Sequence, residues 1–311
     1  MKTITNPAPQ PGNGNALRSI RRPWFDAVRL GNRLVDLVLR TSSIEVLNIG
    51  VPSPGQVEIA PALKRSADAM RAAALDTQTG SLDYASLAKS EAYAAFRKLT
   101  RALPACEIDG LGGQAVQTAF WVNLYNALIL DAVVQYGIAG SLRDHLWLFR
   151  RAAYNVDGMR FSADDIEHGV LRGNRPHWVT KLPSFSRHDP RVRLALRNPD
   201  PRIHFALVCG ARSCPPIAFY EGEDLDRQLN LAAASFVNGG GASFDSQSNT
   251  LWLSRIFRWY QGDFGGRRGI LEVVRRHLKQ PIAREALDDG AYRLRFLPYD
   301  WSLNGTTQSS G

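Results

Sequence analysis

The feature that most restricts the fold is a long apolar stretch in the middle of the chain. Residues 112–138 read GGQAVQTAFWVNLYNALILDAVVQYGI. Apolar side chains recur at i, i+3 and i+4 over several turns, which predicts one long helix that ends at Gly137. Because both faces of this helix are apolar, it is expected to be largely buried, with the rest of the chain packed around it.

The chain before this helix is predicted to be helical, after a polar tail. Residues 1–22 are rich in Pro, Asn and Gly, which predicts disorder. Residues 23–56 predict a helical extension and a Pro/Gly linker, since apolar residues within 24–40 recur at helical spacing among arginines. We expect this amphipathic helix to pack on the body, and contact with a membrane surface is the alternative. Residues 57–104 predict further helices, with Asp83 as an N-cap.

After the central helix the pattern changes to short strands, loops and helices. Helices are predicted over 224–237 and 269–278. Helices first and strands later favour the α+β class, with a helical N-terminal part followed by a mostly antiparallel sheet. We predict one domain over 57–304 and a tail over 305–311. The strand-like segments are MRFSADDIEHGVLRG, IHFALVCG, TLWLSRIF and AYRLRFLPY.

The charge balance is basic, with 38 Lys and Arg against 29 Asp and Glu, and a net charge of +9. The positive residues are scattered and no nucleic-acid motif accompanies them, so we expect a solvated surface and no specific nucleic-acid partner. Weak contact with anionic lipid or nucleic acid is the alternative. No stretch has the roughly 18 consecutive apolar residues of a transmembrane helix. The N-terminus lacks the apolar core of a signal peptide, which predicts a cytoplasmic protein, or a periplasmic one if the start is misassigned.

Two of the three cysteines lie in one segment, residues 202–216, which reads RIHFALVCGARSCPP. Residues 203–208 predict a strand that carries His204. The chain then breaks into a loop that holds Ser213 and Cys214. A thiol on a loop beside a strand with an imidazole is an arrangement that suits a nucleophile, and it equally suits a small structural loop.

Activation of Cys214 requires a nearby imidazolium, an arginine or a helix N-terminus, since the thiolate is the reactive species. Arg212 and a helix start after the two prolines are candidates, while His204 comes within reach only if the loop folds back. In a regular strand His204 and Cys209 point to opposite faces, so we expect Cys209 in the core. The alternative for Cys214 is a buried structural cysteine.

A disulfide between Cys209 and Cys214 would require an oxidising compartment. Their four-residue spacer and the prolines that follow fit the C-x-x-C pattern of redox proteins poorly. The spacing is also not that of a zinc site, and no Gly-rich phosphate loop follows a strand. We therefore predict neither a metal nor a cofactor.

Asn123 and Asn126 lie three residues apart and share one face of the central helix. Buried amides are unfavourable unless they are hydrogen-bonded. These two side chains either satisfy neighbouring backbone groups, or one orients a catalytic group or contacts a substrate.

Glu167 and His168 are adjacent, and Arg172 follows them. His168 is expected to act either as a general acid and base or as a hydrogen-bond partner for a loop. Asp263 and Asp300 stand beside aromatic residues, where a carboxylate must be paired, so we expect them to be structural anchors.

Together these segments resemble the domain of unknown function 547 family. The resemblance spans about 80–304 with the segments in the same order, and the family name implies no reaction. Many members look exported, and the N-terminus of this chain departs from that. The segments are AFWVNLYNAL, DIEHGVLR, DPRIHFALVCGARSCPP, RIFRWYQGDF and LPYDWSL.

A more distant resemblance is to the transglutaminase-like and papain-like cysteine hydrolase fold. In that fold the nucleophilic cysteine opens a buried helix and a histidine lies on a following strand. Here the matching helix position is Asn123 and the matching histidine is His204. The resemblance implies either a degenerate, non-catalytic relative or one whose thiol has moved to Cys214.

The leading hypothesis is a cysteine-dependent acyl-transfer or amide hydrolase activity. Cys214 would attack a carbonyl, His204 or His168 would be the base, and Asn123 or the loop N–H groups would stabilise the oxyanion. One alternative is a non-catalytic protein that binds a peptide or small-molecule ligand, and a further one is a thiol-redox protein. The residues expected to contact the ligand are Asn126, Arg202, Arg212 and Ser213.

Overall fold

The computed structural model describes residues 26–41, 45–51, 58–290 and 292–307. The tail predicted over 1–22 lies outside these residues. No helix in the described ranges combines the length and the apolar character needed to cross a bilayer.

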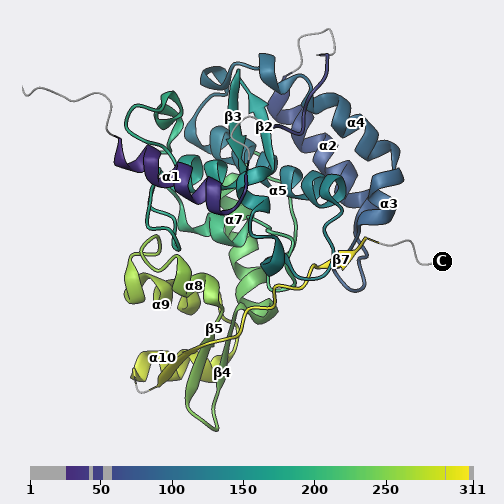
Figure 1. Ribbon diagram of the computed structural model, residues 1–311. Coiled ribbons are helices and arrows are strands. Elements are labelled where there is room, and N and C mark those ends of the chain that lie inside the picture. Colours follow the sequence, from purple (N-terminus) through teal and green to yellow (C-terminus); the bar gives the residue numbers. More distant parts are fainter. Residues whose placement is uncertain (1–25, 42–44, 52–57, 291, 308–311) are drawn as a thin grey trace, which may run out of the picture.

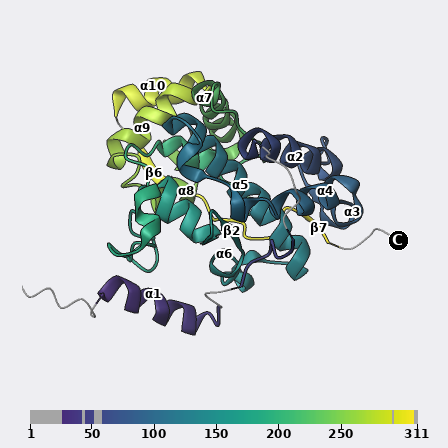
Figure 2. The same ribbon diagram turned by 90° about the horizontal axis from the view of Figure 1, so that it is seen from above.

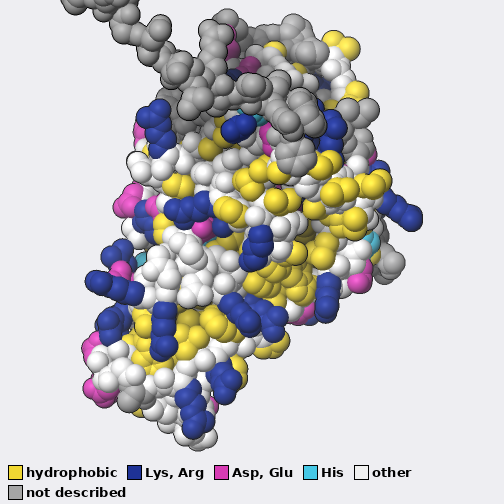
Figure 3. Space-filling model, turned by 60° about the vertical axis from the view of Figure 1, so that its left-hand side comes forward, with side chains coloured by type: hydrophobic (Ala, Val, Ile, Leu, Met, Phe, Trp, Pro, Cys, Tyr) yellow, Lys and Arg dark blue, Asp and Glu magenta, His cyan; other side chains and the backbone are white. Residues whose placement is uncertain are grey.

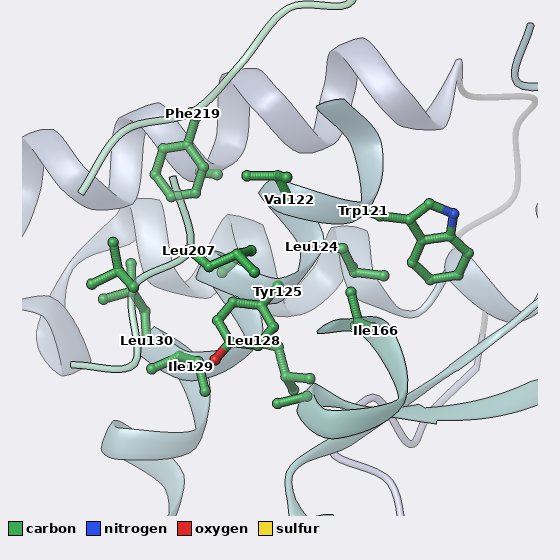
Figure 4. Close-up of a cluster of buried hydrophobic side chains, with 14 of the residues drawn as sticks. Trp121, Val122, Leu124, Tyr125, Leu128, Ile129, Leu130, Ile166, Leu207 and Phe219 are labelled. Carbon is green, nitrogen blue, oxygen red and sulfur yellow. The ribbon is translucent and has the colours of Figure 1, made fainter. Parts of the chain in front are cut away.

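The predicted central helix is present as α5 (Gln114–Tyr136), and Gly137 ends it with a φ of +61°. Every residue from Thr118 to Val133 is buried. Figure 4 shows side chains of α5 in one buried cluster with Ile166 and Leu207, which come later in the sequence. The helix is therefore enclosed on all sides, as its two apolar faces predicted.

The helices before α5 form one layer against it. Residues spaced three or four apart bury one face of α2 (Ile59–Ala74), which packs against α4 (Glu91–Thr100) and α5. Between them lies α3 (Tyr84–Lys89), whose N-cap is Asp83, as predicted: its carboxylate accepts a hydrogen bond from the backbone of Ser86 at 2.9 Å.

The amphipathic N-terminal helix is α1 (Ala27–Val38), and it lies on the outside of the molecule (Figure 2). Its polar side is held to the body, since Asn32 donates to the carbonyl of Pro183 at 2.9 Å and Asp36 pairs with Arg150 at 2.7 Å. None of its residues is buried, and Val38 is 80% exposed. The helix therefore packs on the body but leaves much of its apolar side uncovered.

In the part of the chain that the structure describes, the strands form three small sheets, which confirms the α+β class. Two pairs are antiparallel, β2 with β3 and β4 with β5, whereas β6 is parallel to β5 and β7 is parallel to β1. The strand β7 lies in the predicted C-terminal tail, so that part of the tail is ordered. The strands are β1 (Leu82–Asp83), β2 (Ala153–Val156), β3 (Met159–Ser162), β4 (Ala242–Asp245), β5 (Thr250–Leu253), β6 (Arg293–Phe296) and β7 (Gly305–Thr306).

The C-terminal half also contains the two predicted helices, which are α7 and α9 (Figure 1). The α-helices described after α5 are α6 (Leu148–Arg151), α7 (Leu225–Phe236), α8 (Arg255–Trp259), α9 (Gly266–His277) and α10 (Pro281–Asp289). Short 3₁₀ turns cover Leu103–Ala105, Ile108–Gly110, Leu142–His145, Pro190–Leu194 and Pro201–Phe205, and wide π-type turns cover Asp165–Leu171 and Val237–Gly241.

The prediction of a strand over 203–208 is wrong. Residues Pro201–Phe205 form a 3₁₀ turn, because the Asp200 side chain caps the backbone N–H of Arg202 and a proline follows the cap. This Asp-Pro pair starts a helical turn whatever the strand propensity of the residues after it. The argument that His204 and a following cysteine point to opposite faces therefore no longer applies. Similarly, only the start of the segment 159–173 is a strand, and the rest is a π-type turn.

Two hydrophobic clusters make up the core. The first surrounds α5, and the second lies between α7, α8, α9, α10 and the sheet β4–β5–β6. Tyr299 packs against both clusters. The boundary of a single domain over 57–304 remains a prediction.

One charged group is buried in the first cluster. Asp131 of α5 has no exposed surface, and it accepts hydrogen bonds from Tyr93 at 2.6 Å and from Tyr154 and Arg97 at 2.7 Å. Three donors from two elements, α4 and β2, thus converge on one carboxylate, which satisfies its charge and fixes these elements around α5.

We expect Asp131→Asn to lower the free energy of unfolding by about 3 kcal/mol, because it leaves a guanidinium and two hydroxyls with one neutral amide. Urea denaturation at neutral pH measures this loss. The matched control is Asp288→Asn, which removes an exposed ion pair with Arg275 and should change stability by less than about 1 kcal/mol. Equal effects of the two substitutions would contradict the prediction.

Candidate functional site

A cavity of about 850 Å³ lies where the two clusters meet. Its walls come from α1, α5, the π-type turn, α8 and the loops that carry Trp178, Cys214 and Tyr299. Leu34 and Val38 of α1 line its mouth and are largely exposed. Figure 3 shows one face of the molecule on which hydrophobic side chains gather, with Lys and Arg side chains between and around them. A cavity of this size suits a small organic molecule.

At one wall of the cavity the two neighbouring thiols meet. The Sγ atoms of Cys209 and Cys214 are 2.7 Å apart without a disulfide between them, and both cysteines line the cavity. Gly210, with a φ of +92°, turns the chain after Cys209, and the N–H of Cys214 bonds back to the carbonyl of Ala211 at 3.0 Å. The four-residue spacer is therefore folded into a tight turn that brings its ends together.

The surroundings shift the pKa values of these thiols in opposite directions. Burial opposes the Cys214 thiolate, but hydrogen bonds from the Cys209 thiol, from Tyr299 and from the Cys209 backbone N–H outweigh it and lower the pKa of Cys214. The bond to Cys214 and burial raise the pKa of Cys209 well above its usual range. Cys214 is thus the more acidic thiol and Cys209 its proton-bearing neighbour.

A second polar group surrounds Asp263. Its carboxylate accepts from His204 Nε2 at 2.9 Å and from Arg172 at 2.5 and 3.1 Å, and all three side chains are almost fully buried. Burial opposes ionisation of Asp263, but His204 and Arg172 hold the pKa of its carboxyl below the usual range. Burial lowers the pKa of His204, whose ring stacks on Tyr260 with 3.7 Å between ring centroids.

The π-type turn supplies the polar end of the cavity. Glu167 accepts a hydrogen bond of 2.5 Å from the hydroxyl of Tyr260. Ligand atoms of His168, Asp164 and His177 lie within 4.8 Å of one another, and all three residues line the cavity. Burial raises the pKa of Asp164 to about 7, and burial also lowers the pKa of His177 to about 4 and that of His168 well below its usual range. Both imidazoles are therefore neutral at pH 7.

Hydrogen bonds fix the tautomer of both imidazoles. Arg172, which can only donate, bonds to Nδ1 of His168 at 2.8 Å, and the backbone N–H groups of Val179 and Thr180 bond to Nδ1 of His177 at 3.0 and 3.3 Å. Each neutral ring therefore carries its hydrogen on Nε2. A histidine that ligates a metal instead donates from its other nitrogen to an acceptor. These rings are thus arranged as hydrogen-bond donors, not as metal ligands.

Of the residues predicted to be catalytic, Cys214, His204 and His168 line the cavity and Asn123 does not. In the described part of the chain, the side-chain bonds of Cys214 go to Cys209 and Tyr299 and none goes to a histidine.

Asn123 and Asn126 satisfy backbone groups, which is the structural alternative stated for them. Asn123 bonds to both backbone groups of Tyr220, at 2.7 and 2.8 Å. Asn126 donates to the carbonyls of Ala206 and Ala218 and accepts from the N–H of Val208 at 2.9 Å. Their hydrogen-bonding capacity is directed away from the cavity.

The other residues predicted to contact a ligand also lie elsewhere. Arg202 pairs with Asp200 at 2.5 Å and with Asp226 at 2.7 Å. Ser213 accepts from the backbone of Asp300, and neither it nor Arg212 is among the cavity residues.

Several cavity residues were not predicted from the sequence, among them Asp164, His177 and Tyr299. Asp263 was singled out only as an anchor, although its aromatic surroundings correctly signalled a carboxylate in need of partners. His177 gave no such signal, because its position beside His168 results from the loop that follows the π-type turn.

We expect Asp263→Asn to destabilise the protein by about 3 kcal/mol at pH 7, because it leaves the buried Arg172 without its carboxylate. The pKa of Asp263 is lower in the folded chain than its unfolded value of about 3.9, so its contribution is present above that pH and is lost as the pH falls through the folded value. Urea unfolding of wild type and variant between pH 7 and pH 3 should show a difference that shrinks in acid. Glu272→Gln, in an exposed ion pair, is the control, and a difference that grows in acid would refute this account.

Comparison with known proteins gives one family match. Searches of curated proteins and of solved structures found no match to this chain. The relationship to transglutaminase-like and papain-like hydrolases therefore has no support from these comparisons. The family model that does match covers less than half of the chain, and the matched part includes α5, the π-type turn at Asp165–Leu171 and both thiols of the cavity. Residues 109–237 are similar to the family described as protein of unknown function, DUF547, which confirms the resemblance over that segment.

Proposed function

We propose that this protein is a thiol–disulfide oxidoreductase that acts on a small-molecule disulfide. Cys214 is the attacking thiolate and Cys209 is the resolving thiol. The observation that carries this proposal is the pair of sulfur atoms 2.7 Å apart on a cavity wall, with pKa values shifted in opposite directions. A more acidic attacking thiol beside a protonated second thiol is the arrangement that this exchange requires.

The reaction proceeds in two displacements. The Cys214 thiolate attacks one sulfur of the substrate R–S–S–R, a new S–S bond forms, the substrate bond breaks, and RS⁻ leaves. Cys209 then gives its proton to that RS⁻ and attacks the Cys214 sulfur, which releases the second RS⁻ and closes the Cys209–Cys214 disulfide. The substrate gains two electrons and the protein loses two, which an external thiol reductant returns by the reverse exchange.

The hydrogen bonds favour this reaction over the acyl transfer predicted from the sequence. In cysteine-dependent acyl transfer, an imidazole within hydrogen-bond reach of the sulfur typically acts as the base and then protonates the leaving group. Among the described residues, the donors around Cys214 are Cys209 and Tyr299, whereas the His204 Nε2 is engaged with Asp263. A second thiol therefore occupies the position where acyl transfer would need an imidazole.

The location of the thiols supports a small substrate. Both lie in the cavity beside aromatic side chains, and Tyr299 donates towards them from the second cluster. A protein disulfide would need the sulfur atoms on an open surface, whereas these lie inside a volume suited to a molecule of a few hundred daltons.

The aromatic disulfide dithiobis(nitrobenzoate) tests the proposal, because each displacement releases one coloured thiolate. We expect the wild type to release about two equivalents from this pair and to end with an internal Cys209–Cys214 disulfide. Cys209→Ser should release about one equivalent and retain a mixed disulfide on Cys214, and Cys214→Ser should react slowly. Peptide mapping by mass spectrometry identifies each product.

Cys106 provides the control within the same chain. Burial raises its pKa to about 11, so its labelling should become fast only in alkali, and Cys106→Ala should leave the first displacement unchanged. The rate at Cys214 should instead fall only below the ordinary thiol pKa of about 8.5. A stable mixed disulfide on Cys214 in the wild type, or first attack by Cys209, would rule the proposal out.

A further inference from the structure

At the polar end of the cavity, the Nε2–H group of His168 is available as a hydrogen-bond donor. His168 is 2% exposed and its Nε2 carries hydrogen, because Arg172 donates to the other nitrogen. The nearest acidic oxygen that the structure gives for this Nε2 is on Asp164, at 3.9 Å, which is too far for a hydrogen bond. Because His168 lines the cavity, this N–H group is available to an acceptor on a molecule bound there.

Asp164 and His177 also present polar atoms to the space beside Nε2 of His168. Among the described residues the ion pairs of Asp164 are long, since Nη1 of Arg150 is also 3.9 Å from its carboxylate. His177 lies against His168, with 4.3 Å between the ring centroids, and its tautomer likewise puts hydrogen on Nε2. The site therefore offers a carboxylate oxygen and imidazole N–H groups to one guest atom.

We propose that this end of the cavity binds the hydroxyl group of an apolar alcohol or phenol. A hydroxyl both donates and accepts, so it bonds to the Asp164 carboxylate and to the Nε2–H of His168 at once. The body of the ligand lies against the aromatic and aliphatic wall formed by Trp178, Trp259 and the apolar side of α1.

Other guests match these partners less well. A metal ion needs lone pairs on the imidazoles, which are occupied or protonated here. A carboxylate would face the Asp164 carboxyl, which is ionised only above its pKa of about 7, and an ammonium group would face N–H donors and Arg150. A hydroxyl group matches both partners, because it donates to Asp164 and accepts from His168.

The shape of the cavity fits the rest of such a ligand. Trp178 and Trp259 stack with ring centroids 4.8 Å apart, and both line the cavity. Leu34 and Val38 extend this apolar surface to the mouth, where they remain largely exposed. The inference is independent of the thiols and holds whether or not they react with disulfides.

Calorimetric titration with naphthol, naphthalene and naphthoate tests the inference on the full chain with Cys209→Ser and Cys214→Ser, so that no thiol chemistry interferes. We expect naphthol to bind about tenfold more tightly than naphthalene, because it adds hydrogen bonds to the same ring burial, and naphthoate to bind more weakly than naphthol.

Asp164→Leu should abolish the preference for naphthol and leave naphthalene binding unchanged, while Asp144→Leu, at an exposed acidic residue outside the cavity, should preserve it. Near-ultraviolet circular dichroism establishes that each variant is folded, and His177→Phe provides a second variant with the same expected loss. Equal affinity for naphthol and naphthalene, tighter binding of naphthoate, or Zn²⁺ binding that Asp164→Leu removes would each overturn the inference.

Discussion

The cavity depends on two buried asparagines of α5. Between the 3₁₀ turn that carries His204 and the turn that carries Cys214, the chain forms neither helix nor strand. There the side chain of Asn126 bonds to the backbone groups of Ala206 and Val208, and it also bonds to the carbonyl of Ala218 beyond the thiols. Asn123 does the same for Tyr220. Two amides on one helix face thus act as the template against which an irregular segment is shaped, which explains why polar groups are kept inside an otherwise apolar helix.

The polar groups of the cavity are held by charge balance as well as by hydrogen bonds. Asp263 is paired with Arg172 and His204, and Arg172 in turn sets the tautomer of His168. Arg172 therefore connects Asp263, which holds His204, to His168, which lines the cavity. The thiols lie outside this network. Tyr125 of α5 is close to the network and to the thiols: burial raises its pKa, and the charges of Glu167 and Cys209 raise it further.

Regular elements were predictable from the sequence where one periodicity was strong. The central helix, its end at Gly137 and the Asp83 cap are local properties, and the structure has all of them. The segment 203–208 was misread because a cap and a proline two residues upstream outweighed its strand propensity. The closeness of the two thiols was not predictable from spacing, since it results from a turn at Gly210.

The C-terminal segment has a consequence for how the protein forms during synthesis. After β6 the chain runs from the second cluster back to β1, where β7 completes a parallel pair (Figure 1). On the way Tyr299 reaches the thiols and Leu303 bridges to Ala211. The wall of the cavity that contains Tyr299 is therefore synthesised after the segment that carries both thiols. Until that segment is made, the nascent chain carries its two cysteines without the Tyr299 hydroxyl, which together with Cys209 lowers the pKa of Cys214 in the folded protein.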